Sequence, residues 1–315
     1  MLSRTADHLY WMARYTERAE NIARMLDVNY QMSLLPQGGD VMEQSWIATL
    51  SISDLMDAYQ KKHDTVTPAK ALAFMAFDRD NPSSIYSCLA AARENARAVR
   101  GTLTSEAWET LNSTWIDMRK AVTRYSLGAE IADFFEWVKY RSHLARGVIQ
   151  GTMLRDEAYH FTWLGTYLER ADNTARILDV KYHVLRPQGH EETTDFYQWG
   201  ALLRSVSAFE NYRKVYRDVI TPERVAELLI LHRDLPRSLH FCLNGVVKNL
   251  EMVANRHSGE TLRQAGILHA RLHYARVGDI LEQGLHNWLT DFMDSIYQIG
   301  DGISRDFLVP SQDSN

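Results

Sequence analysis

The chain contains 315 residues, of which 45% are hydrophobic and 24% charged, a balance typical of a globular protein with a substantial core. Its formal net charge of −5 and the lack of a basic block argue against general nucleic-acid binding. The sequence has no apolar run of about 18 residues and no secretory signal at its charged start, so we expect a cytoplasmic protein without a membrane partner.

Helical periodicity dominates the chain and strand signals are almost absent, which predicts an all-α fold. A break at Pro36 follows the first helix, and Thr67 is expected to cap a short helix that begins at Pro68. Ser83 or Ser84 is expected to cap the next one. The first half should contain six helices, at about 4–34, 41–63, from 68, from 84 to about 100, 105–125 and 129–149.

The most informative feature is a repeat: residues 1–30 recur at 153–182, and sixteen of the thirty aligned residues are identical. Thr221-Pro222 repeats Thr67-Pro68, and Pro187-Gln188-Gly189 repeats the break at Pro36. A period near 150 residues is too long for a solenoid unit and predicts a duplicated domain. Because the repeat begins at Met1, we expect nothing to precede the fold.

The expected architecture is a duplicated multi-helix bundle of about twelve helices, in two six-helix halves related by a pseudo-twofold axis. The halves are residues 1–150 and 151–309, and residues 310–315 form a disordered tail. No flexible linker separates the halves, so the helix that ends near Gln150 should run almost straight into the second copy and the halves should pack as one body. Cys88 and Cys242 occupy equivalent apolar positions, which favours two buried thiols over a disulfide.

The first helix has two preserved faces. At about 100° per residue, the shared apolar and aromatic residues form one stripe, whereas Glu17, Asn21 and Arg24 lie on the opposite side, with Asp27 between. The second copy arranges Glu169, Asn173, Arg176 and Asp179 in the same way, and each glutamate is followed by an arginine, Arg18 or Arg170. This pattern predicts a helix contacted on both sides, with its charges paired and partly buried. Near a twofold axis, the two Glu-Arg pairs could converge into one polar centre.

Two interpretations of these charges stay open. One is a buried ion network that fixes how the halves dock, through Glu20–Arg24 and Asp172–Arg176 at i, i+4 and Arg24–Asp27 and Arg176–Asp179 at i, i+3. The other is a ligand-binding or catalytic site.

The sequence resembles the bacterial Alpha-E domain family, all-helical proteins of unknown function named for a Glu-Arg motif. The resemblance is carried by HLYWMARYTERAENIARMLD (8–27), HFTWLGTYLERADNTARILD (160–179) and RENARAVR (93–100), and it covers nearly the whole chain. The family's motif falls on Glu17-Arg18 and Glu169-Arg170. After residue 245 the second copy keeps only Asn249 of the segment that corresponds to Glu94–Arg97.

What the resemblance implies is a place in a multi-protein system. Family members are typically encoded beside a circularly permuted ATP-grasp ligase and a transglutaminase-like peptidase, and are proposed to help make or modify a peptide. We therefore expect an ATP-grasp-type ligase and a transglutaminase-like protein as partners.

Other constellations are weaker. Glu157-x-x-His160 has di-iron spacing, but Thr5 stands where symmetry requires a second carboxylate. His269 and His273 could share a metal but lack an adjacent carboxylate, so half-exposed surface is the preferred interpretation. Arginines 93, 97 and 100 form a basic ridge that is either a solvated face or an anion site. With no Gly-rich phosphate loop or recognisable nucleophile, we expect no metal and no cofactor.

Two hypotheses of function follow. In the first, the protein is a component of an ATP-dependent peptide- or amide-forming system. It binds an anionic or peptide substrate through Arg18, Arg24, Arg170 and Arg176, together with Asn21, Asp27, Asn173 and Asp179. Glu17 and Glu169 then orient those arginines or act as general bases. In the second, the protein is a non-catalytic scaffold whose Glu-Arg pairs only hold the halves together.

Overall fold

A computed structural model describes residues 1–34, 39–125, 130–184 and 192–308, with side chains over 1–34, 42–125, 130–180 and 197–308. These residues are all-helical and contain no strand. The longer helices in chain order are α1 (Ser3–Ser33), α2 (Gly39–Ile52), α4 (Pro68–Ala76), α5 (Ile85–Ala98), α6 (Ser105–Tyr125), α7 (Ile131–Thr152), α8 (Glu157–Val184), α9 (Glu192–Ser205), α11 (Pro222–Leu231), α12 (Leu239–Met252), α13 (Gly259–Tyr274) and α15 (Leu285–Ile303).

Three short helices bring the α-helices of the described residues to fifteen, more than the twelve expected: α3 (Met56–Gln60), α10 (Phe209–Tyr216) and α14 (Val277–Gln283). The expected helix over 41–63 is wrong, because Asp54 takes a left-handed backbone (φ 55°) that ends α2 before α3 begins. Ser207 does the same between α9 and α10, with φ 54°. A π-helical turn, Ser304–Leu308, continues α15.

The predicted caps are confirmed. The Thr67 hydroxyl accepts the Lys70 N–H at the start of α4, and Thr221 accepts the Arg224 N–H at the start of α11. Ser84, not Ser83, is the cap of α5, and Ser238 is the cap of α12. These bonds satisfy helix N–H groups that have no partner inside the helix, so each helix begins at a defined residue. The predicted breaks at Pro36 and Pro187 and the tail from 310 lie outside the described residues.

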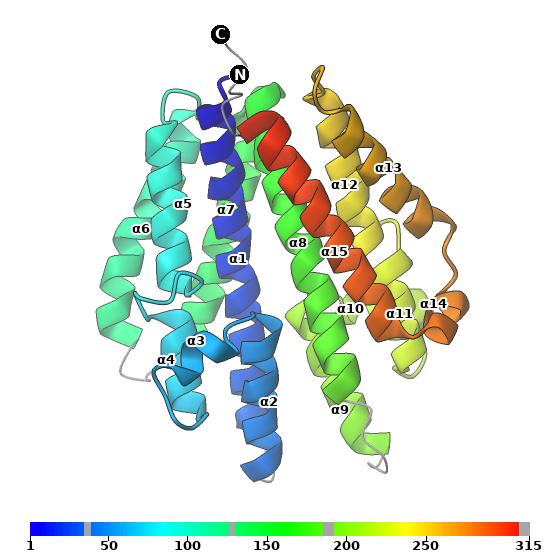
Figure 1. The fold of residues 1–315 in the computed structure, drawn as a ribbon. Coiled ribbons are helices and arrows are strands. Elements are labelled where there is room, and N and C mark those ends of the chain that lie inside the picture. The colour runs from blue at the N-terminus through cyan, green and yellow to red at the C-terminus, as the bar shows by residue number, and fades with distance from the viewer. Residues whose placement is uncertain (35–38, 126–129, 185–191, 309–315) are drawn as a thin grey trace.

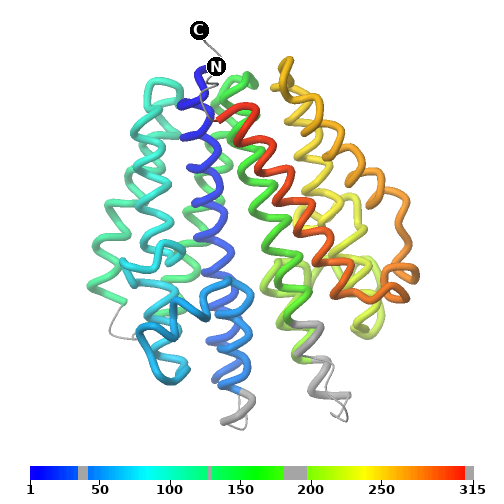
Figure 2. Tube along the Cα trace, in the orientation of Figure 1, coloured from blue at the N-terminus to red at the C-terminus, as the bar shows by residue number. Residues whose placement is uncertain are grey.

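Helices α1 and α8 lie side by side at the centre of the molecule and run in the same direction (Figures 1 and 2). Their N-terminal ends meet, since the amino group of Met1 donates to the Glu157 carboxylate at 2.5 Å. Helices α5 and α7 pack on α1, whereas α12 and α15 pack on α8. The surroundings of the two central helices are therefore alike. His8 bonds Asn95 of α5 at 2.8 Å, and His160 bonds Asn249 of α12 at 2.8 Å.

Helix α1 is covered on both sides, as its two preserved faces predicted. Ala19 and Leu26 are buried on the apolar side, and Glu17 and Asn21 are at most 2% exposed on the polar side. The close approach of α1 and α8 depends on Gly165, because a Cβ there would collide with the carbonyl oxygen of Tyr10. The two helices therefore present their polar faces to each other at short range.

The connection between α7 and α8 differs from the expectation of a nearly straight passage. Helix α7 ends at Thr152, Met153 is extended, and α8 begins only at Glu157, so the chain reverses direction there. Cys88 and Cys242 are both free and fully buried, as predicted. Within the described residues, no helix has the length and apolar character needed to cross a membrane.

Candidate functional site

The two Glu-Arg motifs are paired crosswise between α1 and α8. Arg170 of α8 donates to both oxygens of Glu17, with Nε and Nη2 each at 2.9 Å. Arg18 of α1 donates to both oxygens of Glu169, with Nε at 2.5 Å and Nη2 at 3.0 Å. Each glutamate thus binds the arginine of the other helix in the bidentate geometry that suits a guanidinium and a carboxylate.

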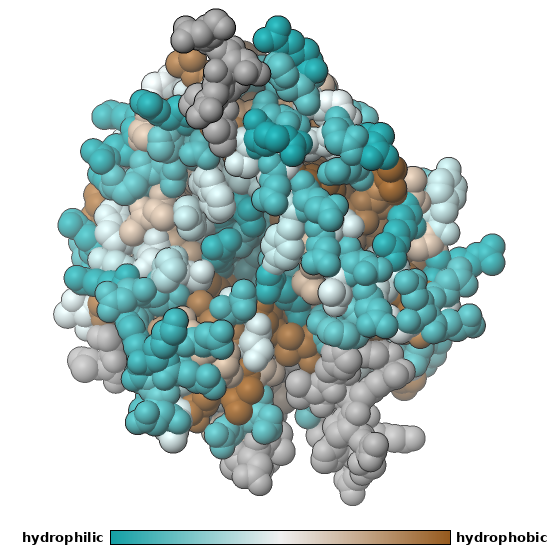
Figure 3. Space-filling view, viewed as in Figure 1, coloured by the Kyte–Doolittle hydropathy of each residue, from teal (hydrophilic) through white to brown (hydrophobic). Residues whose placement is uncertain are grey.

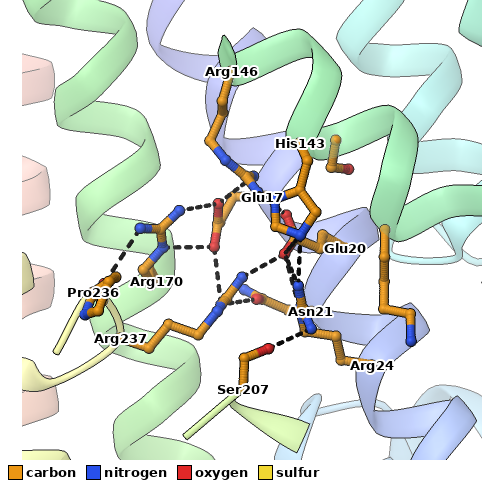
Figure 4. Close-up of polar contacts among 12 residues, drawn as sticks. Glu17, Glu20, Asn21, Arg24, His143, Arg146, Arg170, Ser207, Pro236 and Arg237 are labelled. Atoms are coloured by element: carbon orange, nitrogen blue, oxygen red, sulfur yellow. Dashed lines mark hydrogen bonds and ion pairs between the residues drawn. The ribbon is translucent and has the colours of Figure 1, made fainter. Parts of the chain in front are cut away.

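The Glu17 centre, here named the closed centre, has three arginines around its carboxylate (Figure 4). Besides Arg170, Glu17 receives Nη1 of Arg146 from α7 at 2.8 Å and Nη1 of Arg237 at 3.0 Å. Arg237 lies in the loop before α12, and its second nitrogen, Nη2, donates to Glu20 Oε1 at 2.7 Å. Arg237 is itself buried, with 6% of its surface exposed.

Further contacts fix the remaining groups of the closed centre. Arg24 donates to Glu20 at 2.8 Å and to the Ser207 hydroxyl at 2.5 Å, and it contacts His143 at 2.9 Å. Asn21 accepts from Arg237 at 2.7 Å through Oδ1. Together with Arg170 of α8, these residues come from α1, α7 and two loops, so the centre joins five segments of the chain (Figure 4).

The closed centre holds its two carboxylates ionised. Burial alone would raise the pKa of Glu17, but Arg170, Arg146 and Arg237 outweigh it and lower that pKa to about 2. Burial likewise opposes ionisation of Glu20, and Arg237, Arg146 and Arg24 hold its pKa well below the ordinary value. Carboxylates bound this firmly are weak bases, which makes this centre suited to holding helices together.

The Glu169 centre, in contrast, borders a cleft of about 250 Å³. Glu169 accepts from Arg14 Nε at 2.8 Å as well as from Arg18, and both arginines line the cleft. The front face of the molecule is hollowed between the α1 side and α15, and hydrophilic side chains gather in the hollow (Figure 3). The cleft is lined by Arg14, Arg18, Asn21, Ile22, Met25, Ile52, Ser53, Asp54, Leu55, Ser83, Glu169, Asp172, Asn173, Arg176 and Tyr297.

The cleft contains polar groups that are incompletely satisfied. The Nδ2 group of Asn21 and the hydroxyl of Ser53 are buried with no hydrogen-bond partner among the described residues, and Asn21 is only 2% exposed. Burying such groups without a partner costs about 1–3 kcal/mol each. Burial raises the pKa of Asp172, and the pairing with Arg176 Nε at 3.0 Å only partly offsets this effect. A polar ligand in the cleft would relieve these costs.

The structure brings together most of the residues predicted from the motif. The pairs Glu20–Arg24 and Asp172–Arg176 are confirmed as ion pairs. The pairing of Arg24 with Asp27 is wrong, since Asp27 binds Lys139 of α7 at 2.8 Å.

The other predicted site residues lie as follows. Asp179 binds His286 of α15 at 2.7 Å, whereas Arg176 turns to Asp172 and lies 5.7 Å from the centre of the Tyr297 ring. Asn173 lines the cleft.

Several site residues were not predicted from the sequence. Arg14, Arg146 and Arg237 complete the two centres, but each is present in only one copy of the repeat. A search confined to residues shared by both copies therefore passes over them. A difference between the copies would have indicated Arg237. This residue corresponds to Ser83, so a charge is present in one copy and absent from the other.

The structure also shows the contacts of the weaker candidate sites from the sequence. Glu157 binds the N-terminal amino group and His160 binds Asn249, so the two side chains have separate partners. Arg93 and Arg97 both pair with Glu94 on the surface of α5. His269 and His273, in contrast, are joined by a histidine of α12 that the sequence analysis missed, His240.

Comparison with known proteins agrees with the Glu-Arg geometry. The Alpha-E family, described as a predicted alpha-helical domain with a conserved ER motif, matches residues 1–308. Uncharacterized proteins of Mycobacterium bovis and of two Mycobacterium tuberculosis strains are each 22% identical to this chain over 93% of its length. The chain spans 35% of the length of these relatives. No solved structure matches it.

The crossed Glu17–Arg170 and Glu169–Arg18 pairs are thus formed by the motif for which the matching family is described. The match covers all helices of the described residues. The chain belongs to the Alpha-E family.

Proposed function

We propose that the protein is the substrate-binding component of an ATP-dependent system that forms or modifies a peptide, and that a peptide-like ligand binds in the cleft beside Glu169. The observation that carries the proposal is the asymmetry of the two centres. In one, Arg237 bridges Glu17, Glu20 and Asn21. The other borders a 250 Å³ cleft, in which Asn21 Nδ2 and the Ser53 hydroxyl have no hydrogen-bond partner among the described residues. Small-molecule sites have this character: a concave space with a few convergent polar groups.

The proposal includes the duplicated architecture. Residues 1–150 and 151–309 would be two halves related by a pseudo-twofold axis that passes between α1 and α8. The crossed pairs support it, because a twofold operation exchanges Glu17–Arg170 with Glu169–Arg18. The matching caps and the matching left-handed residues support it too.

The two centres would then have separate tasks. Arg18 and Arg176 would hold the carboxylate or carbonyl groups of the ligand, aided by the free N–H groups of Asn21, while Glu169 orients Arg14 and Arg18. Glu169 suits orientation better than base catalysis, because these two arginines overcome the effect of burial and lower its pKa. Arg24 pairs with Glu20 and Arg170 pairs with Glu17, so these two arginines would stabilise the fold.

The alternative of a non-catalytic scaffold is favoured by one observation, the burial of Glu17 and Glu20 together with Arg170 and Arg237. A buried network of this kind fixes the docking of helices without binding anything. The scaffold hypothesis accounts for the Glu17 centre and leaves the cleft unexplained, so it ranks second.

The test uses the ATP-grasp-type ligase and the transglutaminase-like protein that the family resemblance implies as partners. The three proteins are combined with ATP and small peptides, and products are identified by mass spectrometry. Arg176→Gln in the cleft should abolish product formation while the melting temperature changes little. Its matched control, Arg24→Gln in the closed centre, should lower the melting temperature. Unchanged activity of the Arg176→Gln variant would favour the scaffold.

A further inference from the structure

The loops before α5 and α12 align in sequence, and they differ at the residue just before the helix cap. Ser84 and Ser238 cap the two helices with the same hydrogen bond, to the N–H three residues later. The residue just before the cap is Ser83 in one loop and Arg237 in the other. The cleft is therefore found where the closed centre has its Arg237 side chain.

The contacts of Arg237 show what such a space binds. Its guanidinium donates to Glu20 at 2.7 Å and to Asn21 Oδ1 at 2.7 Å, and lies 3.0 Å from Glu17. The corresponding residues on α8 are Asp172, Asn173 and Glu169, and all three line the cleft together with Ser83. The acceptors that Arg237 uses thus have counterparts in the cleft, where Ser83 stands in place of that arginine. Arg14 and Arg18 bind Glu169 there and Arg176 binds Asp172, so the guanidinium that is missing is the one in the position of Arg237.

A second exchange makes the cleft more negative still. Ser207, which accepts from Arg24 in the closed centre, is replaced by Asp54, at a residue with the same left-handed backbone. Asp54 also lines the cleft. These two exchanges together remove one positive side chain and add one negative side chain.

The pKa shifts of two equivalent carboxyl groups, Glu20 and Asp172, agree with the absence of a cation beside Asp172. Arg237, Arg146 and Arg24 hold the pKa of Glu20 well below its ordinary value. Asp172, at the same place in the repeat, has one arginine bound to it, and burial raises its pKa. One further cation beside Asp172 would restore the balance found in the closed centre.

We propose that the cleft binds a guanidinium or alkylammonium group of its ligand, through Asp172, Asn173 Oδ1 and Glu169, in the position that Arg237 fills in the closed centre. The inference rests on the proposed function and narrows its substrate class to peptides or amino acids with a basic group. The remaining donors, Asn21 Nδ2 and the Ser53 hydroxyl, are available to a carbonyl or carboxylate of the same ligand.

The probe is methylguanidinium at millimolar concentration, with neutral N-methylurea as its isosteric control. Methylguanidinium should bind the wild-type protein saturably in calorimetry and raise its melting temperature by about 1–3 °C. The Ser83→Arg variant, which places the chain's own guanidinium in the cleft, should melt higher than wild type and lose binding at least tenfold. Ser83→Ala is its matched control and should bind as wild type does.

A positive control comes from the closed centre. The Arg237→Ser variant opens the equivalent space and should melt lower than wild type. Methylguanidinium should restore its melting temperature, whereas N-methylurea should not. If that variant is rescued while the wild type binds no methylguanidinium, the basic-group assignment is wrong. If acidic or neutral peptides are processed and methylguanidinium still fails to bind, the proposed function stands and this inference falls. Equal binding by N-methylurea would also overturn it.

An independent observation concerns three histidines of α12 and α13. His269 and His273 lie one turn apart on α13, and His240 faces them from α12, with one nitrogen of each ring within 4.8 Å of the others. The corresponding residues of the first half are Tyr86, Trp115 and Arg119. The trio therefore belongs to the second half alone.

These imidazoles lack the hydrogen bonds that buried polar groups require. Both ring nitrogens of His240, which is 5% exposed, and Nε2 of His269 are buried without a partner among the described residues. A neutral imidazole offers one nitrogen lone pair to a metal.

We infer a site for a divalent metal of the zinc class, held by His240, His269 and His273. Three imidazoles with an open fourth position is a zinc arrangement, and Zn–N distances near 2.0–2.1 Å place the nitrogens about 3.4 Å apart. The two half-exposed rings on α13 could reach this spacing by side-chain rotation. Three charged groups act on the trio: Arg233, 3.4 Å from His273 Nε2, and Glu251 and Lys248, whose charges act on His269. His273 would therefore bind the metal through Nδ1.

The test uses untagged protein stripped with a chelator and titrated with Zn²⁺ in calorimetry and with Co²⁺ in visible absorption. We expect one ion per chain and the intense visible bands of tetrahedral cobalt. His240→Tyr and His269→Trp, which copy the first half, should fold and weaken Zn²⁺ binding at least tenfold. His257→Ala, at an exposed histidine outside the trio, should bind as wild type does. Binding that survives both substitutions, or wild type that binds no ion, would overturn the site.

Discussion

At the scale of single residues, Arg237 decides whether a Glu-Arg centre is closed. Its guanidinium joins Glu17, Glu20 and Asn21, whereas Ser83 at the corresponding place leaves the Glu169 centre beside a cleft. The arginines of the open centre keep some contact with solvent, since the Arg18 side chain is 27% exposed. The same motif can therefore have different energetic roles in one chain.

This difference predicts unequal costs for one substitution made in both motifs. Glu17→Gln leaves buried Arg170 and Arg237 without a full counter-charge and should lower the free energy of unfolding by about 3–5 kcal/mol. Glu169→Gln should cost less, because water in the cleft can solvate Arg14 and Arg18. Urea unfolding of both variants measures the difference. An equal or larger cost at Glu169 would contradict the assignment of the two centres.

At the scale of elements, the packing of α1 on α8 depends on a small side chain at one position. Gly165 faces the Tyr10 carbonyl, and its counterpart in α1 is Ala13, which lies in the same contact. The crossed ion pairs are formed four or five residues further along each helix. A wider separation of the two helices would therefore lengthen both bidentate contacts.

Gly165→Ala should lower the free energy of unfolding by about 1–3 kcal/mol or more, since the added methyl group meets backbone that cannot rotate away. The matched control is Gly147→Ala on the exposed side of α7, where a Cβ meets nothing within 4 Å. That variant should gain about 0.5–1 kcal/mol from its lower backbone entropy when unfolded. Chemical denaturation of the pair tests the prediction, and a neutral Gly165→Ala change would contradict the close crossing.

At the scale of the whole molecule, the central helices are held together by ionised carboxylates. Arginines lower the pKa values of Glu17, Glu20 and Glu169 against the opposing effect of burial. A carboxyl whose pKa is lower in the folded state stabilises the fold above its unfolded pKa, and that contribution disappears as pH falls toward the folded pKa. The stability of the molecule should therefore depend on pH through these three carboxyl groups.

We expect the free energy of unfolding to be steady near neutrality and to fall from about pH 4.5, the ordinary value for glutamate, toward pH 2, where Glu17 titrates. Urea unfolding at a series of pH values measures this slope. The slope should be shallower in Glu17→Gln, which removes one of the titrating groups. An identical slope in that variant would show that groups other than Glu17 cause the loss of stability in acid.

Much of the fold follows from local sequence. The long first helix, the caps at Thr67 and at one of Ser83 and Ser84, and the buried cysteines were all predictable, because helical period, capping chemistry and apolar surroundings act over a few residues. The left-handed turns at Asp54 and Ser207 were not, since both residues also occur inside helices and only their tertiary surroundings impose the break.

The sequence by itself determined that this is an all-helical Alpha-E protein with its motif charges buried and paired, because a preserved polar face on a helix requires partners. Only the tertiary structure decided the identity of those partners. Glu17 and Arg170 are 153 residues apart, and Arg237 and His240 reach their clusters from loops and helices far along the chain. Such contacts depend on how helices pack, and the side chains that decide between a closed centre and a cleft belong to one copy of the repeat alone.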